Sequence, residues 1–374
     1  MISPAAAIRT CFLVAGVTLS LLLLSSNTEA NGQNPAFAAG TAAMERGDYN
    51  QAVNRFDEAI GTDLTSAKSF VKRGECFFAL KNFPLAVADF TAAINLEPRN
   101  AQIYLWRGKS LAKQGKHADA IRDFQQAVRL KPDLAEAHEA QGDSLDSQGD
   151  RRKASLAYGQ ALEQQPESAP LLVKRGRVFQ QQGFTDKALN DFNSAIRLAP
   201  QFSTAYFNRG VVYNGIHRPE DAAADLNKSL QLAPGDAETM FERGRAHAGM
   251  KDPKKAITDY TEALQIYPRT SKYLYQRAKA WQQLSEYDKA LGDYQDAITY
   301  APDELIAAQY YLARAFCYHA MGKDVLANSD IENATRIDTG LPRHIKFDDG
   351  DPTDDQRTGG SDQSTRGHRR RGAN

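Results

Sequence analysis

Arginine and aspartate recur in this chain at a fixed separation that could serve either catalysis or stability. Seven arginines each have an aspartate sixteen residues later: Arg73–Asp89, Arg107–Asp123, Arg175–Asp191, Arg209–Asp225, Arg243–Asp259, Arg277–Asp293 and Arg314–Asp330. A row of carboxylates could act in acid–base catalysis, but a neighbouring arginine keeps a carboxylate ionised and therefore poorly basic. We expect each pair to form an ion pair, which can be bidentate because a guanidinium matches the shape of a carboxylate.

The other reactive side chains lack the spacing of a catalytic or metal site. Cys76 and Cys317 lie far apart in the chain and are expected to be buried apolar residues. None of the seven histidines has a thiol or carboxylate three or four residues away in a pattern that suggests zinc. The chain contains no HExxH, no GxSxG and no glycine-rich phosphate loop. The sequence therefore predicts no cofactor, no small-molecule substrate and no enzymatic activity.

A repeat of 34 residues sets the position of every arginine–aspartate pair. Each unit has a small residue in the eighth place, alanine in the twentieth and, in most units, proline in the thirty-second. In residues 101–134 these are Gly108, Ala120 and Pro132, and Phe124 follows in the twenty-fourth place. The units are 33–66, 67–100, 101–134, 135–168, 169–202, 203–236, 237–270 and 271–304, followed after a three-residue slip by 308–341.

The spacing of apolar residues within a unit predicts two helices. Apolar and small residues three and four apart share one helical face in each half of the unit, and proline stops the second helix. We expect breaks between paired helices near Gly47, Lys81, Gly115, Gly149, Gly183, His217, Lys251, Ser285 and Gly322. The units with Ala39 and Gln141 in the arginine position also lack the aspartate, which favours ion pairing within a unit.

This pattern resembles the tetratricopeptide repeat (TPR) family, whose period and whose order of small, aromatic and proline residues it matches. The resemblance implies an all-α solenoid of helical hairpins, a right-handed superhelix with a concave groove lined by the first helices. It also implies a protein or peptide partner without identifying one, because the shared residues are packing residues. The family's carboxylate clamp is not recognisable, since only Asn208 supplies its asparagine in the sixth place.

A candidate binding stripe runs along the first helices. The fifth residue is apolar in eight of nine units, and we expect Phe207, Phe241 and Tyr275 to form aromatic rungs in the groove. The ninth places would flank these rungs with Arg177, Arg245 and Lys279. An apolar peptide with nearby acidic residues would suit this stripe. The alternative is that the same side chains pack between neighbouring helices and expose little.

The two ends of the chain differ from the repeats. Residues 1–30 combine Arg9, a short apolar run and small residues before Asn31, which predicts a cleaved signal peptide; the alternative is an uncleaved membrane anchor. Residues 342–374 carry an acidic stretch and then a basic end, which predicts a disordered, solvated tail. Either end could still contact a membrane surface, whereas a formal net charge of zero argues against nucleic acid as a partner.

Together these features predict an exported, non-enzymatic scaffold, secreted or periplasmic, that holds an extended peptide or partner protein in its groove. An alternative is a structural subunit of a cell-envelope or membrane-associated assembly, bound through its ends and convex face. A third possibility is localisation at the membrane through an uncleaved N-terminal segment.

Overall fold

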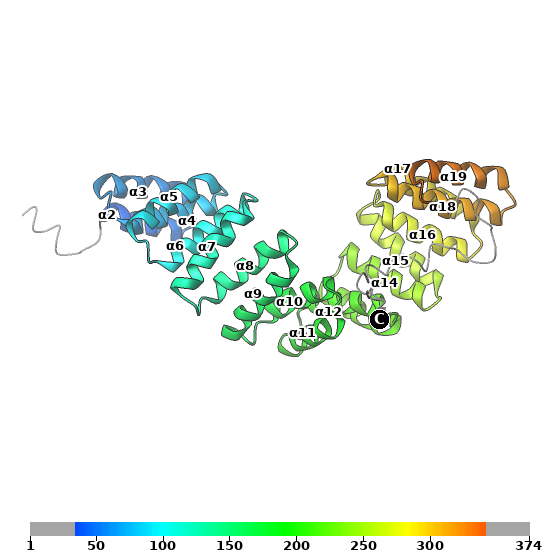
Figure 1. The fold of residues 1–374 in the computed structure, drawn as a ribbon, viewed down its shortest axis with the longest axis horizontal. Helices are drawn as coiled ribbons and strands as arrows, with labels where there is room; N and C mark the ends of the chain where they lie inside the picture. The colour runs from blue at the N-terminus through cyan, green and yellow to red at the C-terminus, as the bar shows by residue number, and fades with distance from the viewer. Residues whose placement is uncertain (1–33, 342–374) are drawn as a thin grey trace, which may run out of the picture. The chain divides into compact units, whose positions relative to one another are not determined.

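The computed structural model describes residues 34–341, and these form eighteen consecutive helices without a strand. The predicted all-α hairpin fold is therefore confirmed. The predicted signal peptide and charged tail lie outside the described residues. The helices belong to two compact units, Met1–Gln182 and Gly183–Asn374. Within each unit, consecutive helices pack against each other as antiparallel hairpins (Figure 1).

The first unit contains nine helices among its described residues. They are α2 (Pro35–Glu45), α3 (Tyr49–Thr62), α4 (Ala67–Ala79), α5 (Phe83–Leu96), α6 (Ala101–Lys113), α7 (His117–Leu130), α8 (Ala135–Ser147), α9 (Arg151–Gln164) and α10 (Ala169–Gln181). The even-numbered helices are the first helices of their repeats. The neighbouring first helices α2, α4, α6 and α8 contact one another in sequence.

The second unit also contains nine helices in the part of the chain that the structure describes. They are α11 (Thr185–Leu198), α12 (Ser203–Gly215), α13 (Pro219–Leu232), α14 (Ala237–Gly249), α15 (Pro253–Ile266), α16 (Ser271–Gln283), α17 (Tyr287–Thr299), α18 (Glu304–Ala320) and α19 (Asp324–Ile337). The first helices α12, α14, α16 and α18 again contact one another in sequence. Their shared surface is called the first-helix face below.

The predicted breaks are confirmed by the backbone. All nine of the expected residues have a positive φ, from 57° at His217 to 79° at Gly149 and Gly183. A left-handed residue just after a helix reverses the chain and is tolerated best by glycine. Four of the nine are not glycine: Lys81, His217, Lys251 and Ser285. These residues adopt the same conformation because the hairpin geometry requires it at that place in every repeat.

The ninth repeat begins earlier than its sequence pattern indicates. Helix α18 starts at Glu304 rather than at residue 308 and has 17 residues, whereas α16 has 13. The Asp303 carboxylate caps this start, since its Oδ1 accepts a hydrogen bond from the Ile306 N–H at 2.8 Å. The three-residue slip in the sequence therefore becomes an additional helical turn instead of a longer loop.

The two helices of a hairpin approach closely where a glycine faces a ring. A Cβ atom built on Gly108 would lie 2.6 Å from Cε1 of Phe124, which is closer than van der Waals contact allows. The same relation holds at Gly40–Phe56, Gly74–Phe90, Gly142–Tyr158 and Gly244–Tyr260. These rings are almost completely buried. The eighth-place glycine is thus required by the space that the ring occupies.

The arginine–aspartate pairs join the two helices of a hairpin, as predicted. In the second repeat, Arg73 donates from Nε and Nη2 to the two carboxylate oxygens of Asp89, at 2.8 and 2.6 Å. Bidentate pairs of the same kind form at Arg107–Asp123, Arg209–Asp225, Arg277–Asp293 and Arg314–Asp330. The ion pair raises the pKa of the Arg107 guanidinium, because its charge is stabilised by Asp123.

In the seventh repeat a histidine shares the aspartate. Both hydrogen bonds from Arg243 to Asp259 reach Oδ1, at 3.0 and 2.5 Å. The other carboxylate oxygen, Oδ2, lies 2.7 Å from Nδ1 of His247. Of the remaining pair, Arg175 belongs to the first compact unit and Asp191 to the second.

The same arginines also connect neighbouring hairpins, which the sequence argument did not anticipate. Nη1 of Arg243 donates to Oδ1 of Asn227, and Nη1 of Arg277 donates to Oγ1 of Thr261, at 2.9 and 3.2 Å. The acceptor stands in the twenty-fifth place of the preceding repeat, and equivalent bonds join Arg73–Asp57, Arg107–Thr91, Arg209–Asn193 and Arg314–Gln295. Each guanidinium therefore holds three helices from two hairpins.

We predict that Gly108→Ala destabilises the chain by ~1–3 kcal/mol, the usual cost of overpacking a filled core. The reason is the contact of the new Cβ with the Phe124 ring. Gly61→Ala is the matched control, because a Cβ at this helical glycine meets nothing within 4 Å. It should stabilise the chain by ~0.5–1 kcal/mol. Urea unfolding followed by circular dichroism measures both. Equal effects of the two substitutions would contradict the close approach.

We also predict that Arg107 and Asp123 are coupled. Arg107→Gln leaves the buried Asp123 carboxylate without its counter-charge, at a cost of up to roughly 3–5 kcal/mol. The double variant Arg107→Gln/Asp123→Ala reproduces Gln141 and Ala157, the residues of the fourth repeat, and should lose less than the two single variants added together. A double-mutant cycle on unfolding free energies should give an interaction of ~0.5–3 kcal/mol. Additive losses would contradict the pairing.

Candidate functional site

The predicted aromatic rungs lie on the first helices α12, α14 and α16, but they differ in exposure. The Phe241 ring is 5% exposed. It stacks on Tyr273 of the next hairpin with ring centroids 4.7 Å apart, and it tilts against Tyr260 of its own hairpin at 5.7 Å. Phe241 therefore forms the wall behind the first-helix face and contributes little to its surface.

Phe207 and Tyr275 are half-buried and remain partly accessible. Phe207 packs on the core cluster that contains Leu226 and Ala246. Tyr275 stacks on Tyr310 with centroids 4.7 Å apart, which repeats the contact between Phe241 and Tyr273 one hairpin later. Neighbouring first helices in this unit therefore contact each other through stacked rings, one in the fifth place of a repeat and one in the third place of the next repeat.

The predicted cations Arg245 and Lys279 line one cavity on the first-helix face of the second unit. The cavity has a volume of about 560 Å³ and is bounded by three consecutive hairpins. Its polar lining includes Asn214 of α12, Arg245 of α14, Tyr260 of α15, and Gln276, Lys279 and Gln283 of α16. The cavity is therefore largely polar at its surface.

A buried glutamate holds part of this lining in place. Glu242 is 5% exposed. Both of its carboxylate oxygens accept from Nη1 of Arg245 at 3.0 Å, and Oε2 also accepts from Nδ2 of Asn214 at 2.9 Å. Asn214 donates in addition to the backbone carbonyl of Glu242 at 2.9 Å. Because Glu242 fixes side chains from two hairpins, it positions the cavity wall.

The remaining predicted site residue, Arg177, is exposed on α10 and belongs to the first unit. Near it in sequence, the first unit carries its own polar cluster on first helices. Nζ of Lys174 donates to Oε1 of Glu139 at 2.7 Å and to both carboxylate oxygens of Asp143 at 2.8 Å. One lysine thus bridges two carboxylates of the preceding repeat, so this cluster is a pre-formed contact between hairpins.

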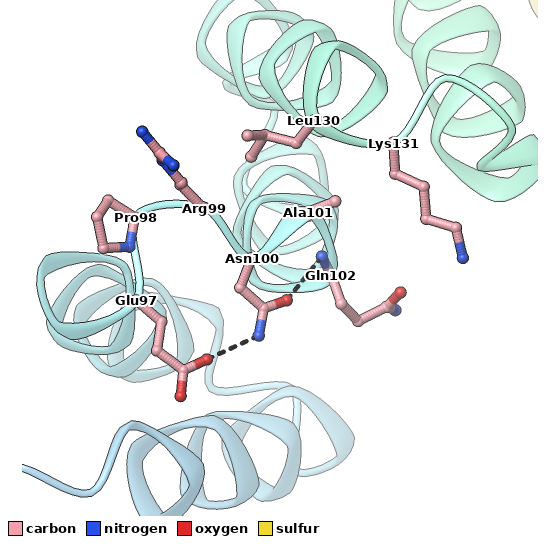
Figure 2. Close-up of a pocket in the computed structure, with 8 residues that line it drawn as sticks. All are labelled: Glu97, Pro98, Arg99, Asn100, Ala101, Gln102, Leu130 and Lys131. Carbon is pink, nitrogen blue, oxygen red and sulfur yellow. Dashed lines mark hydrogen bonds between the residues drawn. The ribbon is translucent and has the colours of Figure 1, made fainter.

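A second cavity lies beside the start of α6 (Figure 2). It is open, about 750 Å³ in volume, and is lined by residues 97–102 with Leu130 and Lys131. Asn100 donates to Oε2 of Glu97 at 2.8 Å and accepts from the Gln102 N–H at 3.1 Å, which caps the helix. The side chains of Arg99 and Lys131 point away from each other in Figure 2. This cavity thus has no convergent polar groups.

The two cysteines among the described residues are shielded from solvent. Cys76 and Cys317 are completely buried, as predicted, and burial raises the pKa of their thiols to about 12 and about 11. Between residues 34 and 341, no group of three histidine, cysteine or acidic side chains is arranged to hold a metal ion. Over the same residues, no helix is long and apolar enough to cross a bilayer.

Comparison with known sequences identifies the fold. Two family models, both described as tetratricopeptide repeat, match residues 37–95, 78–135, 173–237 and 237–270, which is more than half of the chain. The chain belongs to the tetratricopeptide repeat family. The TPR resemblance predicted from the sequence is therefore confirmed. No curated protein matches it in sequence.

Solved structures of other proteins share this fold. A tetratricopeptide repeat protein from Parabacteroides merdae has 19% identity and a TM-score of 0.53, with 64% of this chain and 93% of that chain covered. The APC/C hetero-tetramer Cut9–Hcn1 has 18% identity and a TM-score of 0.52, with 79% of this chain and 57% of that chain covered. For pilF of Pseudomonas aeruginosa the identity is 19% and the TM-score 0.50, with 56% of this chain and 96% of that chain covered. At these identities the likeness shows the fold alone.

Sequence reasoning placed Arg245 and Lys279 in the TPR groove but missed Asn214, Glu242 and Tyr260. Asn214 and Glu242 stand in the twelfth and sixth places of their repeats, and this glutamate differs from the asparagine that the family's carboxylate clamp requires in the sixth place. Tyr260 stands in a core place that is phenylalanine in several other repeats. The signal that could have found it is the single added hydroxyl at an otherwise apolar position.

Proposed function

We propose that this protein is a non-enzymatic scaffold that binds an extended segment of a partner protein along the first-helix face of the second unit. The observation that carries the proposal is the cavity of about 560 Å³, to which three consecutive hairpins contribute polar side chains. A site spread over several repeats suits an elongated ligand better than a compact one.

The chemistry of the face supports a peptide with apolar and acidic residues. Tyr275 and Phe207 present partly exposed rings, which favour apolar side chains. Arg245 and Lys279 present cationic ends at the cavity, where they favour an acidic group. This is the same composition that the spacing of fifth and ninth places predicts.

We also propose that the protein is exported, because residues 1–30 have the composition of a signal peptide. The alternative role is a structural subunit of a cell-envelope or membrane-associated assembly. One observation favours it: Val325 and Leu326, on the last helix α19, are 83% and 47% exposed. An apolar pair at the end of a repeat array could be covered by another protein.

The binding proposal predicts that Arg245→Gln and Lys279→Gln weaken capture of partner peptides by about tenfold or more, a loss of roughly 1.4 kcal/mol. The measurement is affinity on an array of 12-residue peptides, with folding checked by circular dichroism. Lys254→Gln is the matched control, since Lys254 is exposed on the second helix α15 and does not line the cavity.

Two outcomes would contradict the groove assignment. One is equal loss of affinity in all three variants, which would indicate a nonspecific charge effect. The other is a partner that co-purifies stably with every variant while no peptide binds, which would favour the structural-subunit role.

The export proposal predicts that the mature protein begins near Asn31 when it is expressed in a secreting host. The short apolar run and the small residues before Asn31 supply the processing site. N-terminal sequencing of the exported protein measures this directly. Recovery of the chain with Met1 intact in the membrane fraction would instead support an anchor.

A further inference from the structure

The twenty-fourth place of the repeat distinguishes Tyr260 from its equivalents. Four repeats carry phenylalanine there, Phe56, Phe90, Phe124 and Phe192, and three carry tyrosine, Tyr158, Tyr260 and Tyr294. All seven side chains are at most 2% exposed. The other two repeats carry Leu226 and Ile331, so the place requires a large apolar side chain, whereas the hydroxyl is additional and requires a separate explanation.

In two of the three tyrosine repeats, the first helix of the same hairpin supplies an acceptor for the hydroxyl. Tyr158 donates to Oδ1 of Asp143 at 2.8 Å, and Asp143 stands in the ninth place of its repeat. Tyr294 donates to Oε1 of Gln282 at 2.8 Å, and Gln282 stands in the twelfth place. A buried hydroxyl without a partner costs free energy, so such pairing is the usual arrangement.

Tyr260 has no such acceptor. Its hydroxyl is buried and makes no hydrogen bond. The ninth and twelfth places of its repeat hold Arg245 and Ala248, where Tyr158 finds Asp143 and Tyr294 finds Gln282. A guanidinium only donates hydrogen bonds, and alanine has no polar side-chain atom. The phenol is therefore a buried donor at the wall of the cavity that Arg245 and Lys279 also line.

We propose that Tyr260, Arg245 and Lys279 together bind the carboxylate of an aspartate or glutamate side chain in the peptide. This inference rests on the proposed peptide-binding function. A carboxylate can accept from all three at once, because it only accepts hydrogen bonds and carries the charge opposite to that of Arg245 and Lys279. The hydroxyl would then gain the acceptor that Asp143 and Gln282 provide for its equivalents.

The charges around the cavity are compatible with this occupant. Nη1 of Arg245 is the donor in both hydrogen bonds to Glu242, so Nε and Nη2 of Arg245 take no part in that pair. Burial raises the pKa of the Tyr260 phenol, and the positive charge of Arg245 partly offsets this effect. Arg245 is 42% exposed, so its side chain can move to admit a ligand.

Glu220 also lines the cavity, from the first turn of α13, and would repel an anion placed beside it. The donors Arg245, Tyr260 and Lys279 come from α14, α15 and α16. The carboxylate is thus assigned to the side of the cavity formed by these three helices.

The first test needs no ligand and compares Tyr260→Phe with Tyr294→Phe. Both variants remove one hydroxyl at a place where phenylalanine occurs naturally, so both should fold. Tyr260→Phe should leave the melting temperature unchanged or raise it, because the lost hydroxyl had no partner. Tyr294→Phe should lower it, because Gln282 loses its donor. An equal decrease in both variants would overturn the inference.

The second test uses 12-residue probe peptides with blocked ends, leucine and alanine residues, and one central glutamate or glutamine. The parent protein should bind the glutamate peptide about tenfold more tightly, since a charge-assisted hydrogen bond is replaced by a neutral one. Tyr260→Phe should lose about tenfold in affinity for the glutamate peptide only, and Tyr294→Phe should not. Fluorescence polarisation measures each affinity.

The remaining outcomes separate this inference from the proposed function. Equal binding of both probe peptides by parent and Tyr260→Phe would overturn the carboxylate site while leaving the peptide-binding face intact. Binding of neither peptide would contradict the face itself, and the site with it. If the glutamine peptide gains affinity only when its C-terminus is left unblocked, the cavity takes a terminal carboxylate and the assignment to a side chain is wrong.

Discussion

The close contact between a small residue and a large apolar side chain inside a hairpin, a glycine against an aromatic ring in five of them, determines most of this structure. Where a Cβ on Gly108 would come within 2.6 Å of the Phe124 ring, no larger residue fits without movement. The resulting helix separation sets which side chains can face one another across the hairpin. This helix separation recurs with a period of 34 residues, so residues at the same place of different repeats have equivalent surroundings. They can therefore form the same interaction in one repeat after another.

The arginines of the arginine–aspartate pairs connect these similar hairpins to one another. Each guanidinium has five N–H donors in a plane. Two of them bind the aspartate of its own hairpin, and a third reaches the preceding one, as at Arg277 with Asp293 and Thr261. The fourth repeat departs from this pattern, because Gln141 and Ala157 replace both members of the pair. Its hairpin has other contacts instead: Tyr158 donates to Asp143, and Asp143 also accepts from Lys174 of the next repeat.

The regular features of the fold could be predicted from the sequence, and the irregular ones could not. Period, helix pairs, chain reversals and ion pairs all follow from residues that recur at fixed places, so one repeat informs the others. The bond from Arg243 to Asn227 was missed because pairing within and between hairpins was treated as exclusive, although one guanidinium can do both. The extra turn of α18 depends on a single cap at Asp303. The burial of Phe241 depends on Tyr273 in the next repeat. The sequence of one repeat alone reveals neither this burial nor the extra turn of α18.

The alternation of phenylalanine and tyrosine in the twenty-fourth place has an evolutionary consequence. The two residues fill the same space in the core, so exchanging them leaves the helix separation as it is. A change of one oxygen atom can therefore add or remove a recognition group at the edge of a cavity, while the array that holds it is inherited unchanged. Binding preference in such an array can diverge between related chains without any change in architecture.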